Sequence, residues 1–127
     1  MRQKITNPDL HRLADELGVA LIKHDGGGKG YYIHELRLIT TRRGLSIAEY
    51  RSTLAHELAH AHYQDAFSTP KIEARADRWA ANYLLDEHDV RDALIWHNHH
   101  RSPAAYDLEV TEHLLDVWLE NYERKAA

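Results

Sequence analysis

The feature that most constrains this chain is the pentapeptide His-Glu-Leu-Ala-His that begins at His56. The pentapeptide lies in a stretch without glycine or proline between Ser46 and Thr69, which predicts one helix. Residues four apart share a helix face, so His56 and His60 point the same way and can bind one Zn²⁺. Glu57 is turned about 100° from His56, where it can reach a water molecule at the metal without binding the metal. Two ligands and a general base on one helical turn are typical of a metalloprotease.

A second predicted helix carries a candidate for the third protein ligand that a catalytic zinc site requires. Thr69 fits its N-cap, with Pro70 at the first helical position. Glu73 and Asp77 share one face of this helix with Ala80, Ala81 and Leu84. Carboxylates on a buried face need partners, which a metal on Glu73 and a hydrogen bond from Asp77 to a zinc-bound histidine would provide. The alternative leaves both carboxylates in solvent and buries Ile72, Ala76, Trp79 and Tyr83.

These two segments give the chain a resemblance to a known family. The first pentapeptide, followed by Glu-x-x-Ala-Asp-x-Trp-Ala-Ala-x-x-Leu-Leu from Glu73 to Leu85, resembles the ImmA/IrrE family of metallo-endopeptidases, a gluzincin-like group found in phages and mobile elements. The family pattern has Asn in place of Asp77 and Phe in place of Trp79, and its Leu-Leu is followed by Met-Pro, which this chain lacks. The resemblance covers about residues 8 to 120.

The resemblance implies both a site and a substrate. It assigns His56, His60 and Glu73 as metal ligands and Glu57 as the catalytic residue. It implies a zinc-dependent endopeptidase that cleaves an intracellular protein, a helix-turn-helix repressor of a phage or mobile element. The alternative is a non-proteolytic or weakly active zinc module that binds a repressor or an antitoxin. A fourth protein ligand, such as His62 or a histidine from positions 97–100, would favour this alternative, because catalytic zinc keeps one position open.

A peptidase of this kind usually has a second donor that stabilises the tetrahedral oxyanion. The first candidates are His97 and Tyr83, with His99, His100 and Tyr106 as further ones. The histidines at positions 97–100 are interpreted as part of a solvated loop, and a second metal site there is the less favoured alternative.

Composition limits the compartment and the partners. The 127 residues include no cysteine, which excludes disulfides and thiolate ligands and fits a reducing cytoplasm. The formal net charge is −4, and acidic residues crowd the last predicted helix, so direct nucleic-acid binding is not expected. No apolar run has the length of a membrane span or a signal peptide, so we expect no membrane association and a cytoplasmic protein substrate.

The pattern along the chain predicts an α+β class and one small zincin-like domain over residues 1–127. A first helix is expected from Pro8 to Leu17, and the expected strands are Val19–Lys23, Tyr31–Ile33 and Leu36–Thr40. We expect these strands to form a short antiparallel sheet that packs on the two metal-site helices, with residues 26–30 as a hairpin turn.

Helix caps mark the remaining predicted elements. Ser46 and Glu49 form a capping box for the metal-binding helix. A helical C-terminal part is expected, with helix starts at Asp86, Ser102 and Thr111. The strand just before the metal-binding helix is the predicted edge for binding an extended peptide.

Overall fold

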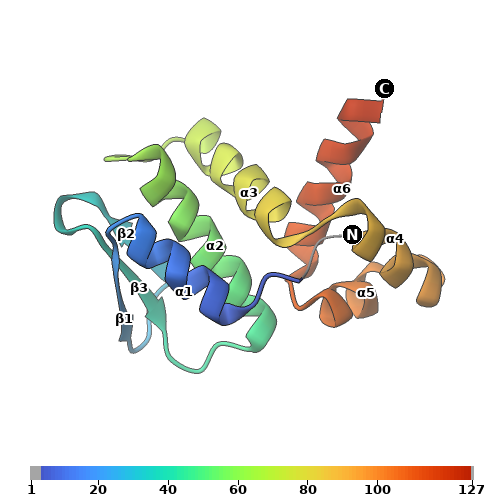
Figure 1. The fold of residues 1–127 in the computed structure, drawn as a ribbon, viewed down its shortest axis with the longest axis horizontal. Helices are drawn as coiled ribbons and strands as arrows, with labels where there is room; N and C mark the ends of the chain where they lie inside the picture. The colour runs from blue at the N-terminus through green and yellow to red at the C-terminus, as the bar shows by residue number, and fades with distance from the viewer. Residues whose placement is uncertain (1–3, 127) are drawn as a thin grey trace.

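The structure, a computed structural model, describes residues 4–126, so the extreme ends of the predicted domain, residues 1–3 and 127, lie outside the described part. A small sheet occupies one end of the molecule and a group of helices the other, with a long central helix between them (Figure 1). In chain order the elements are α1 (Asn7–Glu16), β1 (Ala20–His24), β2 (Gly30–Ile33), the 3₁₀ turn η1 (His34–Leu36), β3 (Leu38–Arg42), α2 (Ile47–Tyr63), α3 (Pro70–Leu84), α4 (Glu87–Trp96), α5 (Arg101–Leu108) and α6 (Glu112–Ala126). The predicted α+β class is confirmed.

The sheet is mixed, so the prediction of an antiparallel sheet was wrong. Its strand order is β1-β3-β2, with β3 parallel to β1 and antiparallel to β2. The glycine-rich segment therefore joins two strands that do not pair with each other. It passes the end of β3, where the backbone N–H of Arg42 donates to the carbonyl of Lys29 at 2.8 Å. Residue patterns locate strands, but they do not determine which strands become neighbours.

The third strand begins later than its residue pattern predicts. Residues 34–36 form η1, and Arg37 follows with a left-handed φ of 48°, so β3 runs from Leu38 to Arg42. Since β3 is central, its two edges are both paired, and the prediction that this strand binds a peptide by its edge was wrong. The free edges belong to β1 and β2, and of these two strands β2 packs against α2, together with the central β3.

The predicted caps at Ser46, Thr69, Asp86 and Thr111 are confirmed, but the predicted start at Ser102 was wrong: α5 begins at Arg101, with His100 as an N-cap that makes no side-chain bond. The Ser46 hydroxyl accepts from the backbone N–H of Glu49, and the Glu49 carboxylate accepts from the backbone N–H of Ser46, both at 3.1 Å. Side chains of Thr69 and Asp86 cap α3 and α4. The Thr111 hydroxyl accepts from the backbone N–H of Leu114 at 3.2 Å in the first turn of α6. These bonds satisfy donors that a helix start leaves without partners.

The core forms around α2, which lies side by side with α3 (Figure 1). The contact face of α3 consists of small or aliphatic residues, Ala76, Ala80, Ala81 and Leu84, all buried. Small side chains let two helix backbones approach closely. This packing turns Glu73 and Asp77 toward α2, and it leaves Trp79 and Tyr83 only partly buried.

A buried arginine joins the N-terminal and C-terminal parts of the domain. Arg51 on α2 is 2% exposed. Its guanidinium donates to the carbonyl of Glu109 at 3.1 Å and to the side chain of Asn7 at 3.3 Å. These bonds tie α2 both to the start of α1 and to the turn between α5 and α6. Among the described residues, no helix has the length and apolar character needed to cross a membrane.

Candidate metal centre

The central helix and its neighbour bring three metal-binding side chains together. His56 and His60 lie one turn apart on α2, and Glu73 faces them from α3. The Nε2 atom of His56 is 2.9 Å from Oε1 of Glu73, and the Nε2 atom of His60 is 3.0 Å from Oε2. One potential ligand atom from each residue lies within 4.8 Å of the others, so the cluster can hold a metal ion.

Carboxylates also fix the orientation of both imidazoles. The Nδ1 atom of His56 is 2.7 Å from Oδ1 of Asp77, and the Nδ1 atom of His60 is 2.9 Å from Oδ2 of Asp65. Because each Nδ1 has a carboxylate partner, both Nε2 atoms are directed at the cluster. Such outer carboxylates commonly fix the ring orientation and raise the basicity of metal-binding histidines.

Sequence reasoning missed Asp65. The chain leaves α2 through Gln64, whose φ of 57° is left-handed, and the backbone N–H of Asp65 returns to the carbonyl of His60 at 2.9 Å. This helix-ending turn brings Asp65 back beside the ring of His60. Such a turn usually contains glycine or asparagine, so the glutamine at position 64 did not predict it. An acidic residue just past the second histidine was the only signal available.

Each outer carboxylate has a cationic or imidazole partner of its own. Asp65 is 8% exposed and pairs with the guanidinium of Arg75 on α3. Asp77 accepts a second contact from Nε2 of His113 on α6, at 2.9 Å. Burial raises the pKa of both carboxyls, but their hydrogen bonds outweigh it and hold each pKa below the ordinary value. Both groups are therefore ionised at neutral pH.

The same carboxylates act on the first histidine. Burial lowers the pKa of His56, while its hydrogen bond to Asp77 and the nearby carboxylates of Glu57 and Glu73 raise it, with a net value of about 9. Burial also raises the pKa of Glu73, but hydrogen bonds from Ser68 and His56 bring it below the ordinary value. A metal must displace the imidazole proton, because only neutral imidazole binds it.

Glu57 lies next to the cluster of His56, His60 and Glu73 but takes no part in the contacts among these three side chains. Its side chain is buried, and burial raises its pKa, although His56 and His60 oppose this effect. The backbone of Tyr32 on β2 hydrogen-bonds to its carboxylate. Glu57 is therefore a buried carboxylate beside the metal-binding cluster and outside it.

A glycine makes this contact between β2 and α2 possible. A Cβ atom on Gly30 would lie 2.5 Å from Cγ2 of Thr53 and 3.4 Å from Cγ of Glu57. The first distance is shorter than side-chain packing allows. Sequence reasoning placed Gly30 in a flexible turn, and the close approach of the strand to the helix was not visible in the pattern.

A cavity of about 390 Å³ opens beside the cluster. Its lining consists of residues from β2, α2, the α2–α3 loop and α3: Gly30, Tyr31, Tyr32, Glu57, His60, Asp65, Ala66, Phe67, Ser68 and Glu73. Two of its aromatic side chains, Tyr31 and Phe67, are 48% and 73% exposed. The donor set of two imidazole nitrogens and one carboxylate without thiolate suits zinc. The residues therefore fit a metal site that is open to a substrate.

The structure does not bring the other predicted site residues to this cavity. Within residues 4–126, His97, His99, His100, Tyr83 and Tyr106 are absent from its lining. His97 ends α4 and pairs with Asp107 at 2.5 Å, and Tyr83 lines a different cavity.

The possible fourth ligand, His62, is directed elsewhere. Its ring stacks on Trp79 with centroids 5.3 Å apart. Within the described part of the chain, the cluster at α2 and α3 has three members, and His62 is not one of them. Sequence reasoning did not identify Tyr31, Tyr32 and Phe67 as site residues. They reach the lining of the cavity only because the tertiary fold brings β2 and the α2–α3 loop beside the cluster.

An α+β fold with a His-Glu-x-x-His helix and a glutamate from the next helix is the architecture of a metallopeptidase. The family model of the IrrE N-terminal-like domain, the M78 peptidases, matches residues 14–120. The chain belongs to this family, which confirms the resemblance to the ImmA/IrrE group. A search of curated proteins found no match.

Proposed function

We propose that this protein is a zinc-dependent endopeptidase whose ligands are His56, His60 and Glu73. One observation carries the proposal. The three ligand atoms converge beside a buried Glu57 on the wall of a 390 Å³ cavity, while Asp77 and Asp65 hold the far nitrogens of the two histidines. Histidines on an ordinary solvent-exposed surface would not need a carboxylate at each Nδ1 to hold the orientation of the ring.

The metal and the chain have separate roles in this proposal. When bound, zinc supplies a Lewis acid that polarises a peptide carbonyl and acidifies water. Glu57 accepts a proton from the attacking water and passes it to the leaving amine. Asp77 and Asp65 accept the Nδ1 protons of the two imidazoles, which leaves each Nε2 as the nitrogen that binds the metal once the metal has displaced its proton.

The substrate backbone is proposed to pair with β2. This strand has a free edge, and Gly30, Tyr31 and Tyr32 line the cavity beside Glu57. An extended peptide added to a strand edge gains main-chain hydrogen bonds with little demand on its sequence. Tyr31 and Phe67 offer exposed aromatic surface for adjacent side chains.

Family membership supports a further proposal about the substrate. We infer that it is a cytoplasmic helix-turn-helix repressor of a phage or mobile element. The competing proposal is a regulatory module that binds a repressor or antitoxin without cleaving it. The three-member cluster and the stacked position of His62 support the enzyme, since a closed structural site would use a fourth protein ligand.

Glu57→Gln separates the two proposals. The substitution keeps the side-chain shape and removes the basic oxygen. Zinc content and thermal unfolding should match wild type, while cleavage of the candidate repressor falls by about 10²–10⁴-fold. Full induction of the repressed genes by this variant in cells, together with unchanged cleavage of the purified repressor, would refute the proposed general base. Induction without cleavage by either protein would establish the binding module instead.

A further inference from the structure

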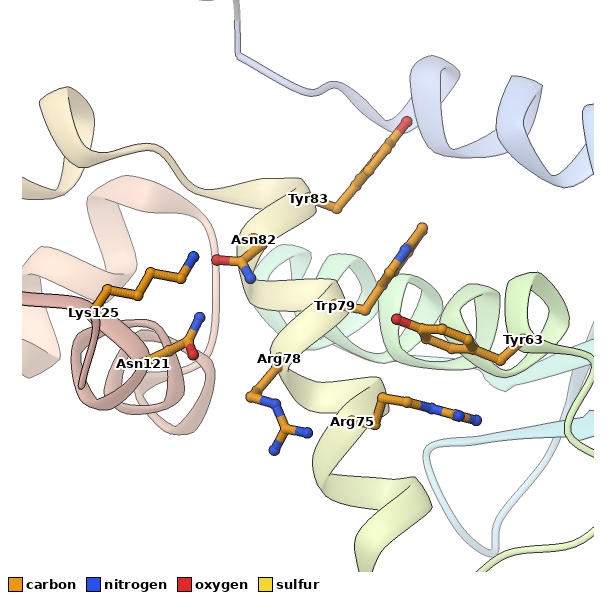
Figure 2. A pocket seen from close by; sticks show the side chains of 8 residues that line it. All are labelled: Tyr63, Arg75, Arg78, Trp79, Asn82, Tyr83, Asn121 and Lys125. Atoms are coloured by element: carbon orange, nitrogen blue, oxygen red, sulfur yellow. The ribbon is translucent and has the colours of Figure 1, made fainter. Parts of the chain in front are cut away.

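A second and larger cavity lies away from the metal cluster. Its volume is about 540 Å³, and its lining comes from the end of α2, from α3 and from α6: Tyr63, Arg75, Arg78, Trp79, Asn82, Tyr83, Asn121 and Lys125. Figure 2 shows these side chains spread along α3, with Tyr63 on one side and Asn121 and Lys125 on the other. We call this cavity the α3–α6 pocket.

The α3–α6 pocket and the metal cluster use different faces of the same helix. Each residue of an α-helix turns by about 100°, so Asn82 projects about half a turn from Glu73, and Arg78 about 140° from Glu73 and about 100° from Asp77. The α3–α6 pocket and the cavity beside Glu57 share no lining residue, although Arg75 of the pocket pairs with Asp65, the carboxylate partner of His60. A ligand there would not block access to the cavity beside Glu57.

The charge of the pocket is opposite to that of the whole protein. The chain has 20 acidic and 16 basic residues, yet the lining contains three cations and no carboxylate. Arg75 has a partner, because its guanidinium pairs with Asp65. Arg78 and Lys125 form no ion pair within residues 4–126, and Arg78 is partly buried. A partly buried guanidinium without a counter-ion favours an anionic ligand.

The aromatic residues of the pocket indicate which kind of anion fits. The guanidinium of Arg75 lies 3.9 Å from the ring centroid of Tyr63. Trp79 stacks on Tyr83 at 5.1 Å with an interplanar angle of 6°, and on His62 at 5.3 Å. Single-stranded nucleic acids bind through bases stacked on available ring faces. In this pocket Trp79 already stacks on both His62 and Tyr83, so its ring faces are not available to a nucleobase. A ligand that binds through carboxylates is therefore favoured over one that binds through bases.

We propose that the α3–α6 pocket binds an acidic segment of a partner protein. Carboxylates of that segment pair with Arg78 and Lys125, and the amides of Asn82 and Asn121 border the same surface. A guanidinium can hold a carboxylate through two parallel hydrogen bonds, which gives Arg78 the larger role. Because Lys125 is exposed, the binding weakens as salt screens the charges.

The test uses short fluorescent peptides and the full chain. The probe is a peptide of alternating Glu and Gly, with the Gln–Gly peptide of equal length and a single-stranded oligothymidylate as comparisons. Fluorescence anisotropy at low salt should detect binding of the Glu–Gly peptide alone. Arg78→Gln should weaken this binding about tenfold, as expected for the loss of one charge-assisted contact. Lys125→Gln, at an exposed position, should weaken it several-fold and provides a second variant if Arg78→Gln fails to fold.

Arg91→Gln is the matched control, because it removes the same charge from an exposed residue of α4 that pairs with Glu87 outside the pocket. Its affinity for the Glu–Gly peptide should equal that of wild type. Unchanged binding by both Arg78→Gln and Lys125→Gln would overturn the proposal, as would an equal loss in Arg91→Gln. Tighter binding of oligothymidylate, lost in Arg78→Gln, would assign the pocket to nucleic acid instead. None of these outcomes depends on zinc or on peptide cleavage.

Discussion

The most informative test of the metal centre is Asp65→Asn, because sequence reasoning did not find this residue. Asp65 is 8% exposed, and its Oδ2 atom lies 2.9 Å from Nδ1 of His60. Asparagine keeps the size of the side chain but removes the negative charge that accepts the imidazole proton. Its amide can also rotate to present a donor to Nδ1. His60 would then lose the fixed orientation that directs Nε2 toward Glu73.

The size of the effect follows from the contact that is lost. A hydrogen bond to a charged group contributes about 1.5–3 kcal/mol. A tenfold change in affinity corresponds to about 1.4 kcal/mol, so zinc affinity should fall by about 10–100-fold. Losses of this size are typical when an outer carboxylate is removed from a metal-binding histidine. Competition with a chromophoric chelator measures the zinc affinity directly.

A matched control is available outside the cavity beside the cluster. Asp107→Asn also removes a carboxylate from a histidine, because Asp107 contacts Nε2 of His97, far from the cluster in the sequence and outside its cavity. Its zinc affinity should equal that of wild type. If Asp65→Asn and Asp107→Asn both bind zinc like wild type, then Asp65 does not position His60 and the reasoning fails.

Three further predictions concern the same region. Asp77→Ala should lower zinc affinity or peptidase activity by about 10–100-fold without unfolding the chain, and unchanged values for both would remove Asp77 from the site. Gly30→Ala should destabilise the protein by about 1–3 kcal/mol in denaturant unfolding, because β2 must move away from Thr53. Adding Thr53→Ser, which removes the clashing methyl group, should restore much of that loss, and a Gly30→Ala protein as stable as wild type would contradict the close packing. Finally, the folded protein raises the pKa of His56 from an ordinary 6.5 to about 9. The protonated imidazole therefore stabilises the metal-free protein below about pH 6.5, and this stabilisation is lost as the pH rises through 9. Thermal unfolding of chelator-treated wild type and His56→Gln across this range should show the loss only in wild type, and parallel curves would refute it.

The sequence alone determined the parts of this protein that depend on local geometry. The spacing of His56 and His60 on one helix face follows from 3.6 residues per turn, whatever the rest of the fold does. The caps at Ser46, Thr69 and Asp86 are equally local, because each side chain bonds to a backbone N–H within its own first helical turn. Glu73 could be selected because a carboxylate on a small-residue face needs a partner.

Only the tertiary structure decided which distant residues meet. The order β1-β3-β2 depends on how strands pair across the chain, and the strand patterns are the same for several orders. Asp65 reaches His60 through a single left-handed residue, and Gly30 is required only because β2 presses against Thr53. The α3–α6 pocket likewise exists because α6 packs beside α3 and brings Lys125 near Arg78. A linear pattern records the period of each helix, but it does not record which face of another element lies opposite.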